Sequence, residues 1–168
     1  MNSVIELFYR RPYMHIKIDD LSSPAVIALL QEHLDDMYAT SPAESVHALD
    51  LNELKKSNIT FFSAWRDDTL LGCIAIKQLC PNHAEIKSMR TAKHARGSGV
   101  ASRLLQHTIE LAIDKAYLSL SLETGTQEYF YAARNLYLKF GFNICGPFAD
   151  YQEDPHSTFM TLPLNTVA

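Results

Sequence analysis

Three strand-like segments follow one another in the middle of the chain, and they restrict the fold more than any other feature of the sequence. Residues 59–66 and 70–79 are rich in strand-forming residues, and residues 85–91 continue the pattern after a short turn. Turns this short can join only antiparallel neighbours, because a parallel connection needs a dozen residues or more. The middle of the chain therefore predicts three antiparallel strands in a row.

Helical patterns lie on both sides of these strands. Upstream, Ser23-Pro24 gives an N-cap followed by proline at the first helical position, and apolar residues then recur at helical spacing as far as Met37. The Ser41-x-x-Glu44 pattern is typical of a capping box and predicts a second helix start. The other predicted elements are a helix that starts at Asp50 and Glu53 and runs to about residue 57, helices over about 99–115 and 130–140, and strands over 14–18, 117–123, 142–148 and 158–162.

The resulting order, β-α-α-β-β-β-α-β-α-β-β, predicts an α/β fold of the mixed α+β kind. We expect a central mixed sheet, mostly antiparallel, with helices on both faces. A chain of 168 residues has the length of one ordinary domain, and we assign residues 14–168 to it. Residues 1–13 form an N-terminal extension in this interpretation. Its apolar side chains predict packing against its own domain or across a homodimer interface.

Charge and cysteine content exclude several classes of protein. The net charge of −4 argues against binding of nucleic acid, and no apolar run is long enough to span a membrane. The three cysteines, Cys73, Cys80 and Cys145, show no CxxC spacing, so neither a disulfide scaffold nor a zinc module is predicted. We therefore expect a cytoplasmic protein with no metal, nucleic-acid or membrane partner.

A glycine-containing loop carries the clearest chemical signal. Residues 96–101, Arg-Gly-Ser-Gly-Val-Ala, lie between a predicted strand and a predicted helix. Glycines let the backbone approach a ligand closely, and the helix start behind them directs free N–H groups toward an anion. Between Glu85 and Arg103 there are five basic residues and one acidic residue, although the whole chain is acidic. The loop therefore predicts a phosphate site.

The same loop has a second interpretation, a dinucleotide-binding fingerprint of an oxidoreductase. Gly97, Gly99 and Ser102 would take the places of its three glycines, and Glu123 would bind the ribose. The third glycine is missing, however, and five residues separate Thr91 from Gly97 where the fingerprint needs a tight turn. The preceding strand is also half polar, whereas the first strand of such a fold is buried on both faces. These observations favour another kind of phosphate site.

Two motifs point to a known family. Arg96-x-x-Gly99-x-Ala101 follows the central strand at a helix start, and residues 133–142 read Ala-Arg-Asn-Leu-Tyr-Leu-Lys-Phe-Gly-Phe. At this separation the two motifs resemble those of the GCN5-related N-acetyltransferase (GNAT) family, and the element order over most of the chain is similar too. Other segments resemble a small bacterial subfamily. One departure is Phe130, where many members carry an asparagine that contacts the cofactor.

The resemblance implies acetyl-CoA as co-substrate, with its pyrophosphate on the N–H groups of residues 96–101 and the Ser102 hydroxyl. The pantetheine arm would add to the edge of the preceding strand. In that strand Ile86 and Met89 are three residues apart instead of two. This indicates either a β-bulge near Ser88, which would free an N–H for the thioester carbonyl, or an irregular, half-exposed strand. The implied cofactor-binding residues are Met89, Arg90, Thr91, Arg96, Gly97, Ser98, Gly99, Val100, Ala101 and Ser102.

The resemblance also implies transfer of the acetyl group to a primary amine of a small molecule or peptide, by direct attack in a ternary complex. Tyr137 is the family-matched acid for the leaving thiolate. Glu85, Glu123 and a water chain are the alternatives for the base, and desolvation at the end of an apolar strand would raise the pKa of Glu123. His47 lies on the expected cover of the acceptor site. Three acidic residues suit either a cationic amine or a solvated helix face: Asp35, Asp36 and Glu44. The competing class is a non-catalytic domain that binds acyl-CoA as a sensor.

Overall fold

The computed structural model describes residues 13–164. The predictions for residues 1–12, including their packing across a homodimer interface, lie outside the described residues. Tyr13, at the start of the described part, is exposed. Of the helices in this part of the chain, none combines the length and apolarity needed to cross a bilayer.

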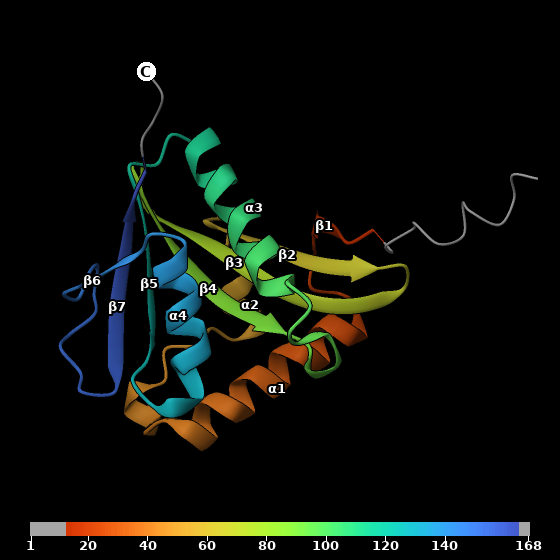
Figure 1. Cartoon of the computed structure of the whole chain (residues 1–168), viewed down its shortest axis with the longest axis horizontal. Coiled ribbons are helices and arrows are strands. Elements are labelled where there is room, and N and C mark those ends of the chain that lie inside the picture. The colour runs from red at the N-terminus through yellow and green to blue at the C-terminus, as the bar shows by residue number, and fades with distance from the viewer. Residues whose placement is uncertain (1–12, 165–168) are drawn as a thin grey trace, which may run out of the picture.

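A seven-stranded sheet forms the centre of the molecule (Figure 1). Its strands lie in the order β1-β2-β3-β4-β5-β7-β6, and β4 with β5 is the parallel pair among antiparallel ones. The strands are β1 (His15–Ile18), β2 (Ile59–Arg66), β3 (Thr69–Cys80), β4 (His83–Thr91), β5 (Ser119–Gly125), β6 (Asn143–Cys145) and β7 (Ser157–Pro163). The helices are α1 (Pro24–Thr40), α2 (Leu51–Leu54), α3 (Val100–Asp114) and α4 (Tyr131–Lys139). The order of these elements confirms the predicted order and the predicted fold class.

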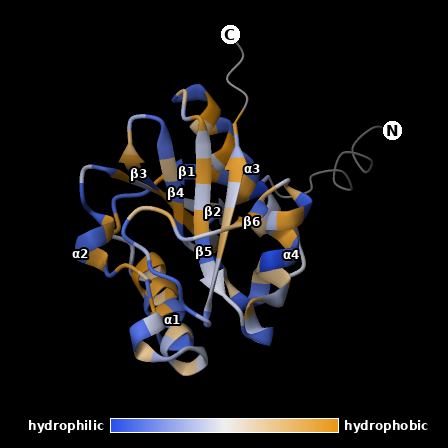
Figure 2. Ribbon diagram, turned by 90° about the vertical axis from the view of Figure 1, so that its left-hand side faces the viewer, coloured by the Kyte–Doolittle hydropathy of each residue, from blue (hydrophilic) through white to orange (hydrophobic). Residues whose placement is uncertain are grey.

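The helices cover both faces of the sheet. Figure 2 shows α1 and α2 on one side of the strands and α3 and α4 on the other. The apolar stripe of α3 supplies Leu104 and Leu105, both fully buried, and α1 supplies Leu29 and Leu30. Because both faces of the central strands are covered, strands such as β3 are buried along most of their length.

The segment between α1 and β2 differs from the prediction. Ser41 ends α1 instead of starting a helix, because a residue that precedes proline is driven out of the helical region and into extended backbone. A single 3-10 turn, Ala43–Ser45, follows it. The helix start predicted at Asp50 is confirmed, and Asp50 forms a capping box there with Glu53, but the helix ends at Leu54 and not near residue 57.

β6 is also shorter than the predicted strand over residues 142–148. It ends at Cys145, and Gly146 and Pro147 follow it. Proline has no N–H to donate to a neighbouring strand, so the ladder stops before it.

β4 carries the irregularity that the spacing of its apolar residues suggested. Cys73 pairs with Arg90 and Ala75 with Lys87, so β4 has one more residue than β3 over this stretch, and Ser88 has a φ of 51°. This is a β-bulge, which confirms the first of the two interpretations. Since Cys73 and Ala75 point to the same face, Lys87 and Arg90 also share a face of the sheet.

β4 also separates from β5 partway along its length. The parallel pairing runs from His83 with Ser119 to Glu85 with Ser121. Beyond that point β4 stays with β3, while β5 stays with β7 as far as Gly125. An opening therefore lies between two neighbouring strands near the middle of the sheet.

Candidate active site

A cavity of about 770 Å³ lies where β4 and β5 separate. Its walls come from α1, residues 41–48, β4, the glycine loop, β5, the 3-10 turn Glu128–Phe130 and α4. The sequence-predicted site residues that line it are Met89, Arg90, Thr91, Arg96, Gly97, Gly99, Val100, Ala101, Ser102, Glu123 and Tyr137. Two others, Ser98 and Glu85, are not part of its lining. The fold thus brings most of the predicted residues to one cavity.

Two glycines shape the loop in front of α3. Gly97 and Gly99 have φ values of 74° and 83°, in the left-handed region that disfavours side chains. A Cβ atom at either position would meet no atom within 4 Å, so the space beside the loop is open. The first hydrogen bond of α3 runs from the Arg103 N–H to the Gly99 carbonyl. It leaves the N–H groups of residues 100–102 without an acceptor inside the helix, and they can hold an anion.

Two cations from different elements add positive charge to the cavity lining. Arg96 from the loop and Lys139 from α4 line it, and among the described residues neither is in an ion pair. The Ser98 hydroxyl turns away and donates to the Ala95 carbonyl at 2.5 Å. The glycine-loop end can therefore attract a polyanion with its backbone N–H groups and the Arg96 guanidinium.

Glu123 stands at the other end of the cavity, on β5. It lies two residues beyond Ser121, the register partner of Glu85, so its side chain points to the same face as Glu85. Burial raises the pKa of Glu123 to about 7. A carboxyl group with this pKa can accept and release a proton at neutral pH.

Tyr137 reaches the opening from α4, on the opposite side of the sheet from α1 (Figure 2). Its ring is buried against Phe142, with 5.7 Å between the ring centroids. Its hydroxyl lies 4.0 Å from the Met89 sulfur, on the part of β4 that has left β5. Burial raises the pKa of Tyr137, so the hydroxyl keeps its proton at neutral pH. Glu123 and Tyr137 therefore meet the opening from its two faces.

Glu85 belongs to a buried cluster on β4 and is only 2% exposed. Its carboxylate lies 3.2 Å from the Lys87 ammonium and accepts a hydrogen bond from the Tyr151 hydroxyl. Lys87 also donates to the Tyr151 hydroxyl at 2.8 Å and to the His47 carbonyl at 3.0 Å. The cluster fastens two distant segments, those around His47 and Tyr151, to the α1 side of β4.

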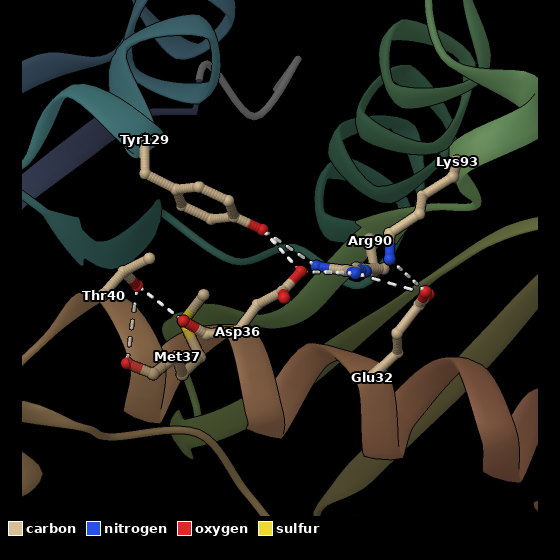
Figure 3. A network of polar contacts seen from close by, with 7 residues as sticks. All are labelled: Glu32, Asp36, Met37, Thr40, Arg90, Lys93 and Tyr129. Atoms are coloured by element: carbon tan, nitrogen blue, oxygen red, sulfur yellow. Dashed lines mark hydrogen bonds and ion pairs between the residues drawn. The ribbon is translucent and has the colours of Figure 1, made fainter.

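Arg90 forms a second cluster on the same face, drawn in Figure 3. Its guanidinium lies 2.7 Å from the Asp36 carboxylate and 3.4 Å from Glu32, both on α1, and donates to the Tyr129 hydroxyl at 3.0 Å. That hydroxyl donates in turn to Asp36 at 2.9 Å, and Lys93 pairs with Glu32 at 2.8 Å. The hydrogen bond from Arg90 lowers the pKa of Asp36. The side chain of Arg90 therefore holds α1 in place.

Phe130 fills the position at which the resemblance predicts an asparagine. The ring is buried and lies so close to Gly125 that a Cβ atom there would come within 2.2 Å of it. Arg134 donates to the carbonyls of Gly125 and Gln127 at 2.7 and 3.0 Å, which fixes the turn after β5. The aromatic ring thus replaces a polar contact with close packing.

Three histidines line the cavity on the α1 side: His33, His47 and His156. Burial lowers the pKa of His33 to about 4 and also lowers the pKa of His47, so both rings are neutral at pH 7. The His47 ring packs edge-on against Tyr151, with 5.0 Å between the ring centroids.

Sequence reasoning missed Tyr129, Tyr151 and the side-chain roles of Lys87 and Arg90. Lys87 lies 40 residues from His47 and 64 from Tyr151, and Asp36 lies 93 residues from Tyr129. No local pattern joins residues at these separations. The one available signal was charge: Lys87 and Arg90 are cations at positions that a bulged strand turns to the same face.

Comparison with known proteins adds independent findings. The family model described as "Acetyltransferase (GNAT) family" matches residues 26–142. The chain is 54% identical over 151 residues to the uncharacterized N-acetyltransferase YsnE of Bacillus subtilis (strain 168), covering 90% of this chain and 100% of that protein.

Solved structures give the same picture of the fold. A Klebsiella pneumoniae protein proposed to be an acyl-CoA N-acyltransferase superposes with a TM-score of 0.76 at 28% identity, covering 92% of this chain and 99% of the other. The PaiA N-acetyltransferase of Thermoplasma acidophilum, solved in complex with coenzyme A, superposes with a TM-score of 0.71 at 19% identity, covering 90% and 99%.

Proposed function

The chain belongs to the acetyltransferase (GNAT) family, and we propose that it is an N-acetyltransferase that moves the acetyl group of acetyl-CoA to a primary amine by direct attack in a ternary complex. The observation that carries this proposal is the opening between β4 and β5. A phosphate-binding loop lies at one end of it, and Glu123 and Tyr137 lie on its two faces.

The glycine loop fits the pyrophosphate of acetyl-CoA. The open space beside Gly97 and Gly99, the free N–H groups of residues 100–102 and the Arg96 guanidinium supply a backbone cradle with positive charge. The separated edge of β4 offers backbone groups to an extended pantetheine arm, as a sheet edge does to an added strand. The bulge at Ser88 leaves the ladder there locally open, which suits a thioester carbonyl.

In the chemical step, the amine nitrogen forms a bond to the acetyl carbon and the carbon–sulfur bond breaks. Glu123 takes the proton that the ammonium must lose, because its pKa of about 7 lets it act as a base at neutral pH. Tyr137 gives its proton to the departing thiolate of coenzyme A. The nitrogen of the tetrahedral intermediate carries one proton more than the amide, and this proton passes to the Tyr137 phenolate, while Glu123 returns its proton to water. The products are an N-acetylamine, the free thiol and one released proton, so atoms and charges balance.

Between the two candidate bases, we propose Glu123. Glu85 is buried, paired with Lys87 and separate from the cavity lining, so it contributes charge and not a reachable oxygen. Membership of the family weighs against the sensor and the dinucleotide alternatives. As part of the same proposal, residues 14–168 form the catalytic domain, residues 1–13 are an N-terminal extension, and the enzyme is cytoplasmic.

A thiol-release assay tests the proposed function. The full chain is mixed with acetyl-CoA and a panel of amines, amino acids and peptides, and free coenzyme A is measured. We expect release that requires both acetyl-CoA and an amine. A folded protein that binds coenzyme A in calorimetry, yet releases no thiol with any acceptor, would support the sensor alternative instead.

A further inference from the structure

The face of the sheet that points to α1 bears two cations beside the cavity, and both are already neutralised. Lys87 is paired with Glu85, and Arg90 with Asp36 and Glu32. The cations that line the cavity and form no ion pair among the described residues come from elsewhere: Arg96 from the glycine loop, and Lys139 from α4, on the opposite side of the sheet from α1 (Figure 2). An acceptor on the α1 side therefore meets no unpaired positive charge among the described residues.

The two clusters also bind the walls of the acceptor side together. The Arg90 cluster ties α1 to the 3-10 turn that carries Tyr129 (Figure 3). The Lys87 cluster ties the segment at His47 to the segment at Tyr151. Because the bulge brings Lys87 and Arg90 opposite residues only two apart on β3, the clusters stand roughly 7 Å apart along the strand.

Many polar groups of the two clusters are satisfied by one another, although the Arg90 Nε atom, the Ser88 hydroxyl and the His33 Nδ1 atom have no partner among the described residues. The Tyr129 hydroxyl accepts from Arg90 and donates to Asp36, and the His47 carbonyl accepts from Lys87. The several amide groups of a peptide would find few partners here beyond Ser88 and His33, and a carboxylate would lose water without gaining an unpaired cation. The remaining lining includes apolar groups such as Met37 and Val46, together with neutral imidazoles.

From this pairing of charges and polar groups we propose that the acceptor is a small primary amine with an apolar body and no carboxylate, and not the amine of an amino acid or a peptide. The inference rests on the proposed acetyl transfer, since it defines the second substrate of that reaction. Such an amine needs one proton acceptor, which Glu123 supplies, and an uncharged pocket, which the two neutralised clusters leave. A cavity of about 770 Å³ that is shared with the co-substrate leaves room for a molecule of this size.

Four matched amines test the proposal on the full chain: 2-phenylethylamine, phenylalaninamide, phenylalanine and a Phe-Ala-Ala peptide amide. kcat/KM is compared per neutral amine, so that differences in amine pKa drop out. We expect phenylalanine to fall at least about tenfold below phenylalaninamide, and the peptide amide at least about tenfold below 2-phenylethylamine. Equal kcat/KM values for the two members of either pair would overturn the inference and leave the proposed acetyl transfer standing. Absence of turnover with every amine would overturn the proposed function itself.

A matched pair of variants tests the charge argument directly. Asp36→Asn keeps the shape of the side chain but leaves Arg90 with a surplus positive charge, whereas Asp35→Asn removes the same charge from a side chain that bonds only to Gln31 among the described residues. We expect Asp36→Asn to reduce the discrimination against phenylalanine at least about threefold, and Asp35→Asn to leave it unchanged. Equal discrimination in a folded Asp36→Asn variant would overturn the inference.

Discussion

The two ends of the cavity use charge in opposite ways. At the glycine loop, Arg96 has no ion-pair partner within residues 13–164, and the N–H groups behind Gly99 lack helical partners. On the α1 side, Lys87 and Arg90 are buried and matched by carboxylates. A binding site for a polyanion needs positive charge that no carboxylate compensates, whereas a site that must admit an ammonium ion gains from the absence of such charge. The difference indicates which substrate belongs at which end.

The largest expected effect concerns the proposed proton donor to the leaving thiolate, and not either end of the cavity. Tyr137→Phe keeps the buried ring and removes the proton donor, so kcat should fall by about 10²–10⁴ while coenzyme A affinity is retained. Steady-state kinetics and calorimetry measure the two quantities. An unchanged kcat, with the chemical step shown to be rate-limiting, would refute the role of Tyr137.

Glu123→Gln tests the chemistry of the α1 side. We expect kcat to fall by about 10²–10³, because the base is lost but water remains. Since burial raises the pKa of Glu123 to about 7, the carboxylate predominates only above that pH, and kcat/KM of the unaltered enzyme should rise as pH increases through 7. The Glu123→Gln variant should lose this rise of kcat/KM with pH. If the rise through pH 7 persists in the variant, it reports the titration of another group, and the assignment of the base is wrong.

Gly99→Asp tests the glycine-loop end. The new side chain would occupy the open space in front of α3 and bring negative charge to an anion site, so coenzyme A affinity should fall roughly 10- to 100-fold. Gly146→Asp is the matched control, because it adds the same charge beside open space at a residue outside the cavity lining. Gly99→Ala separates strain at a φ of 83° from charge and should cost less. Undiminished affinity in a folded Gly99→Asp variant would exclude this loop as the phosphate site.

The smallest expected effect concerns the cluster that holds α1. Tyr129→Phe removes one hydroxyl that joins Arg90 to Asp36, so the free energy of unfolding should fall by about 1 kcal/mol. Because the change lies away from the glycine loop, affinity for coenzyme A should stay the same. Denaturant unfolding and calorimetry provide the measurements. A loss of coenzyme A affinity without a loss of stability would show that the two ends are not independent.

Local sequence determined most of the fold. The bounds of α3 and α4 follow from apolar periodicity and a glycine or aromatic start, and β2 occupies the predicted residues 59–66. Two of the predictions that failed were at Ser41 and at residues 142–148, where a nearby proline outweighed a capping or strand pattern. These elements are short, so a single residue decides them.

The sequence by itself also specified the glycine-loop end of the cavity, because a positive φ at Gly97 and Gly99 and a free helix start depend on neighbours within one turn. Only the tertiary structure decided the α1 side. Whether Glu85 or Glu123 faces the cavity depends on Lys87, which pairs with one of them.

The partners of Arg90 likewise come from α1 and from Tyr129, on segments far apart in the chain. Sequence patterns reflect the backbone geometry of residues that are neighbours in the chain. The charge state and reach of a buried side chain depend on partners that packing brings together across 40 to 93 residues.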